Sequence, residues 1–362
     1  MNGSLTILIL VSYFLVLILI SKITSKNSDN ESFFNGKRQS PWPVVAFGMI
    51  GASLSGVTFI SVPGWVNTSQ FSYFQMVLGY LLGYGVIATI LLPLYYRLNL
   101  NSIYTYLEGR FGIWSYKTGA FYFLISRTIG AAFRLYLIAN VLQIMVFDSL
   151  NIPFAFTVAL TISLIWIYTH QAGIQTIVWT DTLQTFFMIT AVLCSFYYVA
   201  NVLNWTINEA INQITTSDYS KIFFLENVSS SKFFPKQFIT GAFIAIVMTG
   251  LDQDMMQKNL SCKSLKDAQK NMFWFSLVLV LVNLLFLGLG ALLYIYASKF
   301  NISSTGDDLF AAVAMHDQMP VVVGILFLLG LIAAAYSSAD SALTALTTSF
   351  CIDFMNLQKK EK

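Results

Sequence analysis

Charged residues are scarce in this chain. Asp, Glu, Lys and Arg make up 10% of its 362 residues, whereas 56% are hydrophobic. A soluble domain carries about 25% charged residues, so the composition excludes an ordinary soluble globular protein. The mean hydropathy of +0.68 agrees. The sequence therefore predicts an all-α integral membrane protein, because helices satisfy their backbone hydrogen bonds within the lipid.

Cysteine and histidine are also few, which argues against disulfide, metal-binding and catalytic sites. The three cysteines lie in or beside apolar runs, without the spacing of a disulfide framework or a metal site, and the two histidines stand far apart. The sequence shows no nucleophile–base pair and no nucleotide-binding loop. We therefore expect neither an enzyme nor a nucleic-acid-binding protein.

Nine apolar runs are long enough to cross a hydrocarbon core of about 30 Å. They cover residues 4–22, 45–66, 72–97, 118–147, 153–171, 178–203, 236–256, 270–298 and 320–350. The first run lacks a basic leader and a cleavage site, so it is predicted to be a span. A flexible linker is expected before the second run, and an amphipathic surface segment is expected between the sixth and seventh.

The basic residues predict the orientation of the chain in the membrane. With the N-terminus outside, fourteen Lys and Arg residues fall on the inner side and four on the outer side. Positively charged loops stay in the cytoplasm. We therefore expect a multi-pass protein of the cytoplasmic membrane, with the N-terminus outside and the C-terminus in the cytoplasm.

The last apolar run contains a polar stripe. Ser337, Ser341, Thr344 and Thr348 follow helical spacing and share one face. Such a stripe can coordinate a small dehydrated cation, or it can let two membrane helices approach closely. Asp340 lies mid-helix in the same run, where it needs a cation or an arginine as its partner.

The second apolar run is predicted to be a broken helix. It places three glycines and three hydroxyl residues between positions 48 and 58, and Pro63 and Gly64 follow. Discontinuous helices bind ions and substrates at mid-membrane, although a Gly/Ser packing face is the alternative.

Further polar residues lie in other runs. Asp181, near the start of the sixth run, is either an N-terminal cap or an ion or proton site. Arg127 and Arg134 are seven residues apart and share one face. Each either holds a carboxylate substrate or snorkels and forms a structural ion pair. The polar cluster at 250–258 predicts a gate or a loop anchor.

Taken together, these motifs resemble the sodium:solute symporters. The stretches that carry the resemblance are 51–56 with Pro63 and Gly64, 92–98 leading to 106–112, 173–178 followed by 179–184, and 250–254 with 330–350. The resemblance implies a LeuT-type core of two inverted five-helix repeats, preceded by one extra helix. The expected parts are a peripheral first transmembrane helix at 1–24, a cytoplasmic linker at 25–44, a first repeat at 45–203, an outer loop at 204–235 and an incomplete second repeat of three helices at 236–362.

The resemblance also implies Na+ as the coupling ion and a set of site residues. The main sodium site would consist of Gly51, Leu54, Ala334, Ser337 and Ser338. A second sodium would lie among Asp181, Ser337, Asp340 and Ser341, with Asp340 standing where related carriers have serine. Substrate contacts would come from Ser53, Ser55, Thr58, Gln75 and Arg134.

Family members have at least twelve helices, so we expect a fragment or truncated sequence that lacks the last two core helices. The predicted function is sodium-coupled import of a small organic solute, favouring an anion such as a carboxylate or sugar acid. The alternatives are a membrane sensor module of a signalling protein and an inactive symporter remnant. The expected partners are the solute, sodium ions and the lipid bilayer. The sequence does not indicate an oligomeric state.

Overall fold

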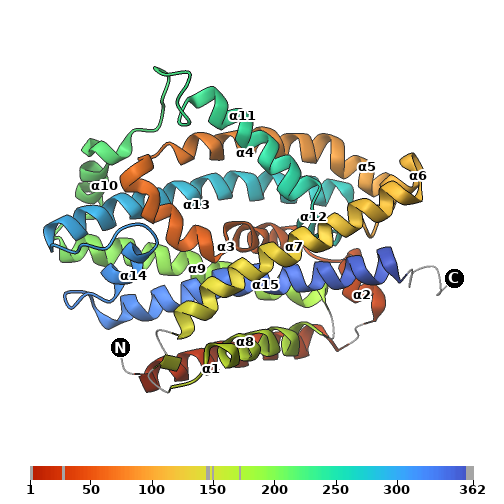
Figure 1. The fold of residues 1–362 in the computed structure, drawn as a ribbon, viewed down its shortest axis with the longest axis horizontal. Coiled ribbons are helices and arrows are strands. Elements are labelled where there is room, and N and C mark those ends of the chain that lie inside the picture. Colours follow the sequence, from red (N-terminus) through yellow and green to blue (C-terminus); the bar gives the residue numbers. More distant parts are fainter. Residues whose placement is uncertain (1–2, 27–28, 144–146, 149–150, 171–172, 356–362) are drawn as a thin grey trace.

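The computed structural model describes residues 3–26, 29–143, 147–148, 151–170 and 173–355, and its regular elements there are all helices (Figure 1). The nine apolar runs all form helices within this described part. They are α1 (Gly3–Thr24), α3 (Trp42–Ser69), α4 to α5 (Tyr73–Arg97), α7 (Ile113–Leu142), α8 (Phe154–Thr169), α9 (Ile174–Val202), α11 to α12 (Phe234–Leu260), α13 (Leu265–Lys299) and α15 (Val321–Ser349). Five of these are long and apolar enough to cross a membrane, or six if the bent α11–α12 pair is one span.

Shorter elements connect or extend these helices. They are α2 (Asn30–Asn35), η1 (Gly36–Arg38), α6 (Thr105–Phe111), α10 (Ile207–Thr216), η5 (Asp218–Ser220), α14 (Asp308–Ala314) and the π-turn η7 (Phe350–Phe354). The π-turn η2 (Ile87–Leu91) joins α4 (Tyr73–Val86) to α5 (Leu92–Arg97). As expected for the segment between the sixth and seventh apolar runs, α10 is amphipathic. Thr206 and Glu209 cap its start, and it buries Ala210 and Ile214.

Helix α3 lies at the centre of the molecule, where it packs against α9, α13 and α15 (Figure 1). Its helical path is interrupted at Ser55, whose φ of 45° and ψ of 165° are non-helical. Few residues other than glycine adopt a positive φ, so this conformation confirms the predicted break.

A second interrupted helix is formed by α11, η6 and α12, and α11 packs against α4. Helix α11 (Phe234–Ala245) and the π-turn η6 (Ile246–Gly250) end before α12 (Gln253–Leu260), which turns away by 67°. Two glycines allow α11 to lie directly against α4. A Cβ added at Gly79 would come 2.0 Å from the Phe238 carbonyl oxygen, and one at Gly241 would come 2.0 Å from that of Met76. The two backbones therefore touch.

The structure corrects two predictions. The linker at 25–44, predicted to be flexible, contains α2 and η1. The Gln257 amide also donates a 2.8 Å hydrogen bond to the Phe34 carbonyl within this linker.

The sixth apolar helix, α9, begins at Ile174 rather than 178. Asp181 is therefore two turns inside the helix and is not its N-terminal cap. The polar Gln175 does not interrupt the helix, which is why α9 begins earlier than predicted. Gln171 and Ala172 lie outside the described residues.

Candidate functional site

The polar stripe of α15 is completely buried against α3 and α9. Its hydroxyl and carboxylate side chains have exposed fractions of 0–2% at Ser337, Ser338, Asp340, Ser341, Thr344 and Thr348. Buried polar groups require partners, so the contacts of each side chain show which role it can play.

Ser338 lies where α15 faces the interrupted part of α3. Its Oγ is 3.5 Å from the Ala52 carbonyl oxygen and 3.4 Å from that of Ala334. These contacts are long for a hydroxyl donor. Of the predicted main-site residues, Ala334 and Ser338 are therefore in contact here, and Gly51 and Leu54 lie within two residues of Ala52 on the facing part of α3. Carbonyl and hydroxyl oxygens of this kind can replace the water shell of a dehydrated cation.

Ser337, the fifth predicted ligand, points to Asp181. Its hydroxyl donates a 2.6 Å hydrogen bond to Asp181 Oδ1, and the Ser341 hydroxyl lies 3.4 Å from Oδ2. Asp181 itself is fully buried. The structure thus brings three of the four predicted second-site residues into direct contact.

Lys258 of α12 is the partner of Asp181 that sequence reasoning missed. Its Nζ lies 2.6 Å from Asp181 Oδ2, and the exposed fractions of the two side chains are 1% and 0%. The only sequence signal was the polar cluster at the end of the seventh apolar run. Because these residues are 77 positions apart, nothing local indicated that they pair.

Asp340 completes the predicted second-site set, but it contacts neither arginine of α7. Its Oδ2 accepts a 2.9 Å hydrogen bond from the Tyr168 hydroxyl of α8, and its Oδ1 accepts one of 2.6 Å from the Ser341 backbone N–H. The prediction that an arginine pairs with Asp340 is wrong. The tyrosine was not foreseen because it belongs to the fifth apolar run, which carried no polar motif.

The two arginines differ in their surroundings. Arg127 forms ion pairs with Asp254 and, at 3.4 Å, with Asp252 in the bend between η6 and α12. Arg134 is half-buried and has no ion pair with a described residue. Of the two open interpretations, the structural ion pair therefore holds for Arg127, whereas Arg134 is available to a ligand.

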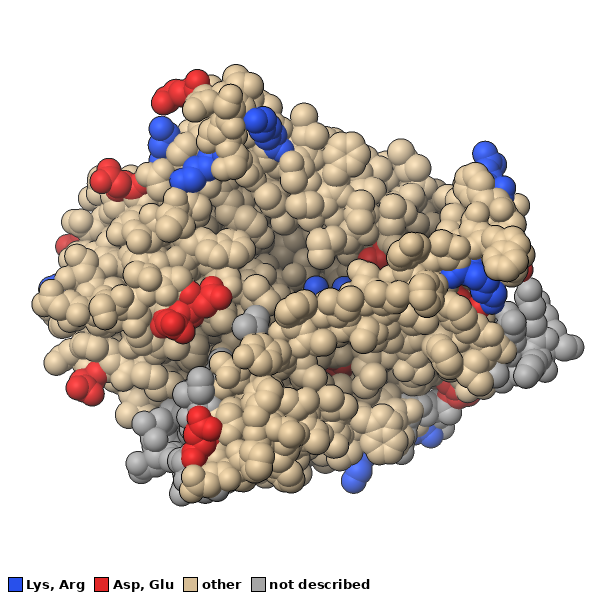
Figure 2. All heavy atoms as spheres, in the orientation of Figure 1, with Lys and Arg blue, Asp and Glu red and all other residues tan. Residues whose placement is uncertain are grey.

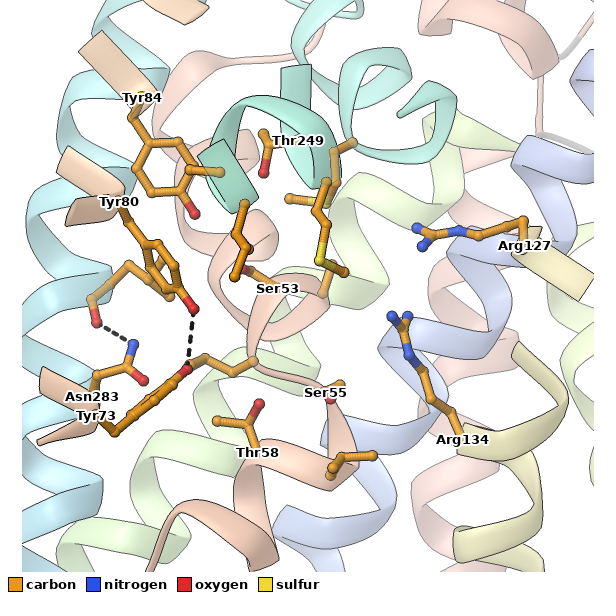
Figure 3. A pocket seen from close by; sticks show the side chains of 18 residues that line it. Ser53, Ser55, Thr58, Tyr73, Tyr80, Tyr84, Arg127, Arg134, Thr249 and Asn283 are labelled. Atoms are coloured by element: carbon orange, nitrogen blue, oxygen red, sulfur yellow. Dashed lines mark hydrogen bonds between the residues drawn. The ribbon is translucent and has the colours of Figure 1, made fainter. Parts of the chain in front are cut away.

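Both arginines line one cavity of about 330 Å³ beside the break in α3. Basic atoms are visible in the floor of a hollow on the face shown in Figure 2. Ser53, Ser55 and Thr58 of α3 also line the cavity (Figure 3). Four of the five predicted substrate contacts therefore share one cavity.

Gln75 of α4, the fifth predicted substrate contact, instead holds the segment that joins α9 to α11. It is fully buried and is not among the cavity-lining residues. Its amide donates to the Lys232 carbonyl at 2.9 Å and accepts from the Phe224 N–H at 3.2 Å. Its assignment as a substrate contact is wrong, because both ends of its amide are hydrogen-bonded to the backbone of residues 224 and 232.

Three tyrosines on the opposite cavity wall were missed. Tyr73, Tyr80 and Tyr84 of α4 lie across the cavity from the arginines (Figure 3), with the Tyr73 and Tyr80 hydroxyls 3.4 Å apart. Their spacing of seven and four residues places them on one helix face, a signal that was present in the sequence. Thr249 and Asn283 also line the cavity.

Comparison with known proteins identifies the family. The model for the sodium:solute symporter family matches residues 33–362. The chain belongs to the sodium:solute symporter family. It is 23% identical to the sodium/sialic acid symporter SiaT of Proteus mirabilis, over 97% of this chain and 71% of that protein. It is 25% identical to the sodium/sialic acid symporter NanT of Aliivibrio fischeri, over 91% of this chain and 65% of that protein.

A solved structure supports the same fold. The chain superposes on a Na+-coupled sialic acid symporter, in its substrate-bound outward-open state, with a TM-score of 0.85 and 21% identity, covering 97% of this chain and 74% of the other. The fold is therefore LeuT-like, as expected from the sequence. The members of this family to which the chain is similar are sodium-coupled transporters and not enzymes.

Proposed function

We propose that this protein is a symporter that couples the inward movement of Na+ to the import of a small solute bearing a carboxylate, such as a sugar acid. The observation that carries the proposal is the guanidinium of Arg134, which lines the cavity beside the broken α3 and has no ion pair with a described residue. The relatives named as sodium/sialic acid symporters agree with this class of solute.

The charges around the cavity explain why Arg134 is the residue that selects the solute. Arg127 is neutralised by Asp252 and Asp254, whereas no described acidic residue is paired with Arg134. A planar guanidinium binds a carboxylate through two parallel hydrogen bonds. The hydroxyls of α3 and of the α4 tyrosines offer hydrogen bonds to the rest of a polyhydroxylated solute.

Sodium is proposed to bind where α15 meets the break in α3, at the carbonyls of Gly51, Leu54 and Ala334 and the hydroxyls of Ser337 and Ser338. An ion held between two helices favours the arrangement in which those helices are close. Because the same part of α3 lines the cavity, sodium and solute favour the same conformation, and this shared preference couples their binding. We also propose that the N-terminus lies outside. When the site opens to the cytoplasm, the ion leaves because the sodium concentration there is low.

A thermal-shift screen tests the solute class directly. Purified protein in sodium buffer is screened against sugars, sialic acids, amino acids and monocarboxylates, and each active acid is compared with its neutral amide. We expect stabilisation by the acid and not by the amide. Arg134→Ala should weaken binding of the acid about 10- to 100-fold, the size of one lost charge-assisted contact.

Arg110→Ala is the matched control, because Arg110 is exposed on α6. It should leave the response to the acid unchanged. Equal stabilisation by the acid and its amide, or full binding of the acid by Arg134→Ala, would contradict the assignment of a carboxylate solute.

A further inference from the structure

Asn283 of α13 places a buried amide in the wall of the cavity beside the break in α3. It lines this cavity, and its exposed fraction is 1%. Figure 3 shows it on the same side of the cavity as Tyr73 and Tyr80, opposite Arg134. A solute that extends across the cavity from Arg134 therefore meets this amide.

The orientation of the Asn283 amide is fixed by its own helix. Its Nδ2 donates a 2.8 Å hydrogen bond to the Leu279 carbonyl, one turn earlier in α13. A carbonyl oxygen only accepts hydrogen bonds, so the reversed amide would set two oxygens against each other. The amide oxygen, Oδ1, is therefore the atom that remains for other contacts.

Oδ1 of Asn283 has no hydrogen-bond partner among the described residues, although nearly all buried polar atoms have one. The hydroxyls of Tyr73 and Tyr80, which line the same cavity, lie 3.4 Å from each other, and neither is bonded to Oδ1. Because an amide oxygen accepts but cannot donate, its partner has to be a hydrogen-bond donor on the molecule that occupies the cavity.

We propose that the solute carries a hydroxyl group or an amide N–H on the side remote from its carboxylate, and that this group donates to Asn283 Oδ1. This selection rests on the proposed function, in which Arg134 holds the carboxylate. A solute without such a donor would displace water from Oδ1 and leave the buried oxygen unpaired, which costs affinity. Asn283 is therefore a specificity residue that rejects simple carboxylic acids, which Arg134 alone would accept.

Two acids that differ in one group test the requirement for a donor. Para-hydroxybenzoate and para-methylbenzoate share the ring and the carboxylate, and the methyl group is similar in size to the hydroxyl but cannot donate. The concentration of each acid that half-maximally stabilises the purified protein is measured in sodium buffer. We expect the hydroxy acid to bind at least about tenfold more tightly, because only this acid satisfies Oδ1.

Asn283→Leu removes the amide oxygen and keeps a side chain of similar size. It should abolish the preference for the hydroxy acid. It should also weaken the acid that binds most tightly in the thermal-shift screen, at least about tenfold. Asn271→Leu is the matched control, because Asn271 is also fully buried in α13 but does not line the cavity. That variant should bind every acid as the unsubstituted protein does.

The outcomes separate the choice of donor from the proposed function. Equal binding of the two benzoates by the unsubstituted protein would refute the donor at Asn283, and so would unchanged binding of the acid from the screen by Asn283→Leu. If Arg134→Ala still weakens these acids, the carboxylate solute stands without that donor. If the protein binds no acid, with or without a donor, the proposed function itself is overturned.

Discussion

Replacing Lys258 by methionine should destabilise the folded protein by about 3 kcal/mol. The Lys258 ammonium and the Asp181 carboxylate lie 2.6 Å apart with exposed fractions of 1% and 0%. At an effective dielectric constant of about 20, two such charges attract each other by roughly 6 kcal/mol. Much of this attraction only offsets the desolvation of both groups, so removing one partner costs about 3–5 kcal/mol. We expect the lower end because Ser337 still donates to Asp181.

The same reasoning predicts that a second substitution restores stability. Adding Asp181→Asn to Lys258→Met removes the unpaired charge and retains an oxygen that can accept the Ser337 hydrogen bond. A buried ion pair replaced on both sides is often nearly neutral, so the double variant should lie within about 1 kcal/mol of the unsubstituted protein. Equilibrium unfolding in detergent measures all four members of the double-mutant cycle.

Lys266→Met is the control for this cycle, because Lys266 is exposed near the start of α13. It should change the free energy of unfolding by less than about 0.5 kcal/mol. If Lys258→Met is equally harmless, or if the effects of the two buried substitutions simply add, the two groups do not form the ion pair described here.

Further substitutions test the helix contacts and the two arginines. Gly79→Ala or Gly241→Ala should destabilise the protein by at least about 1–3 kcal/mol, because the new methyl group meets the backbone of the facing helix. Gly85 lies in α4 like Gly79, but a Cβ added there meets nothing within 4 Å, so Gly85→Ala should leave the free energy of unfolding unchanged. Equal unfolding curves for all three variants would contradict this packing. Arg127→Met should cost about 3 kcal/mol, because it leaves a buried carboxylate unpaired. Arg134→Met should cost less than about 1 kcal/mol, because it breaks no ion pair, and the reverse order would show that the roles of the two arginines are exchanged.

The sequence predicted the features whose signals are local. Apolar length located the nine helices, and glycine, serine and proline in close succession indicated the break that the structure places at Ser55. The hydroxyl stripe of α15 followed from helical spacing alone. These predictions succeed because backbone conformation and the face of a helix depend on neighbouring residues.

The contacts between distant residues were not predictable in the same way. Lys258 and Asp181 come from helices 77 positions apart, and Tyr168 meets Asp340 only because α8 packs on α15. Gln75 was misassigned for the same reason, since its partners lie in a loop that is distant in sequence. The supply of hydrogen-bond partners is set by tertiary packing, which a single sequence does not specify.

Sodium-dependent solute uptake by Ser338→Ala tests the central claim most directly. Ser338 lies where α15 meets the interrupted α3, so loss of its hydroxyl should raise the sodium concentration for half-maximal uptake at least about tenfold. Ser163→Ala, which removes an exposed hydroxyl from α8, should leave it unchanged. An unaltered sodium dependence in Ser338→Ala, or uptake driven equally well by a proton gradient, would contradict the proposed sodium site and the coupling that depends on it.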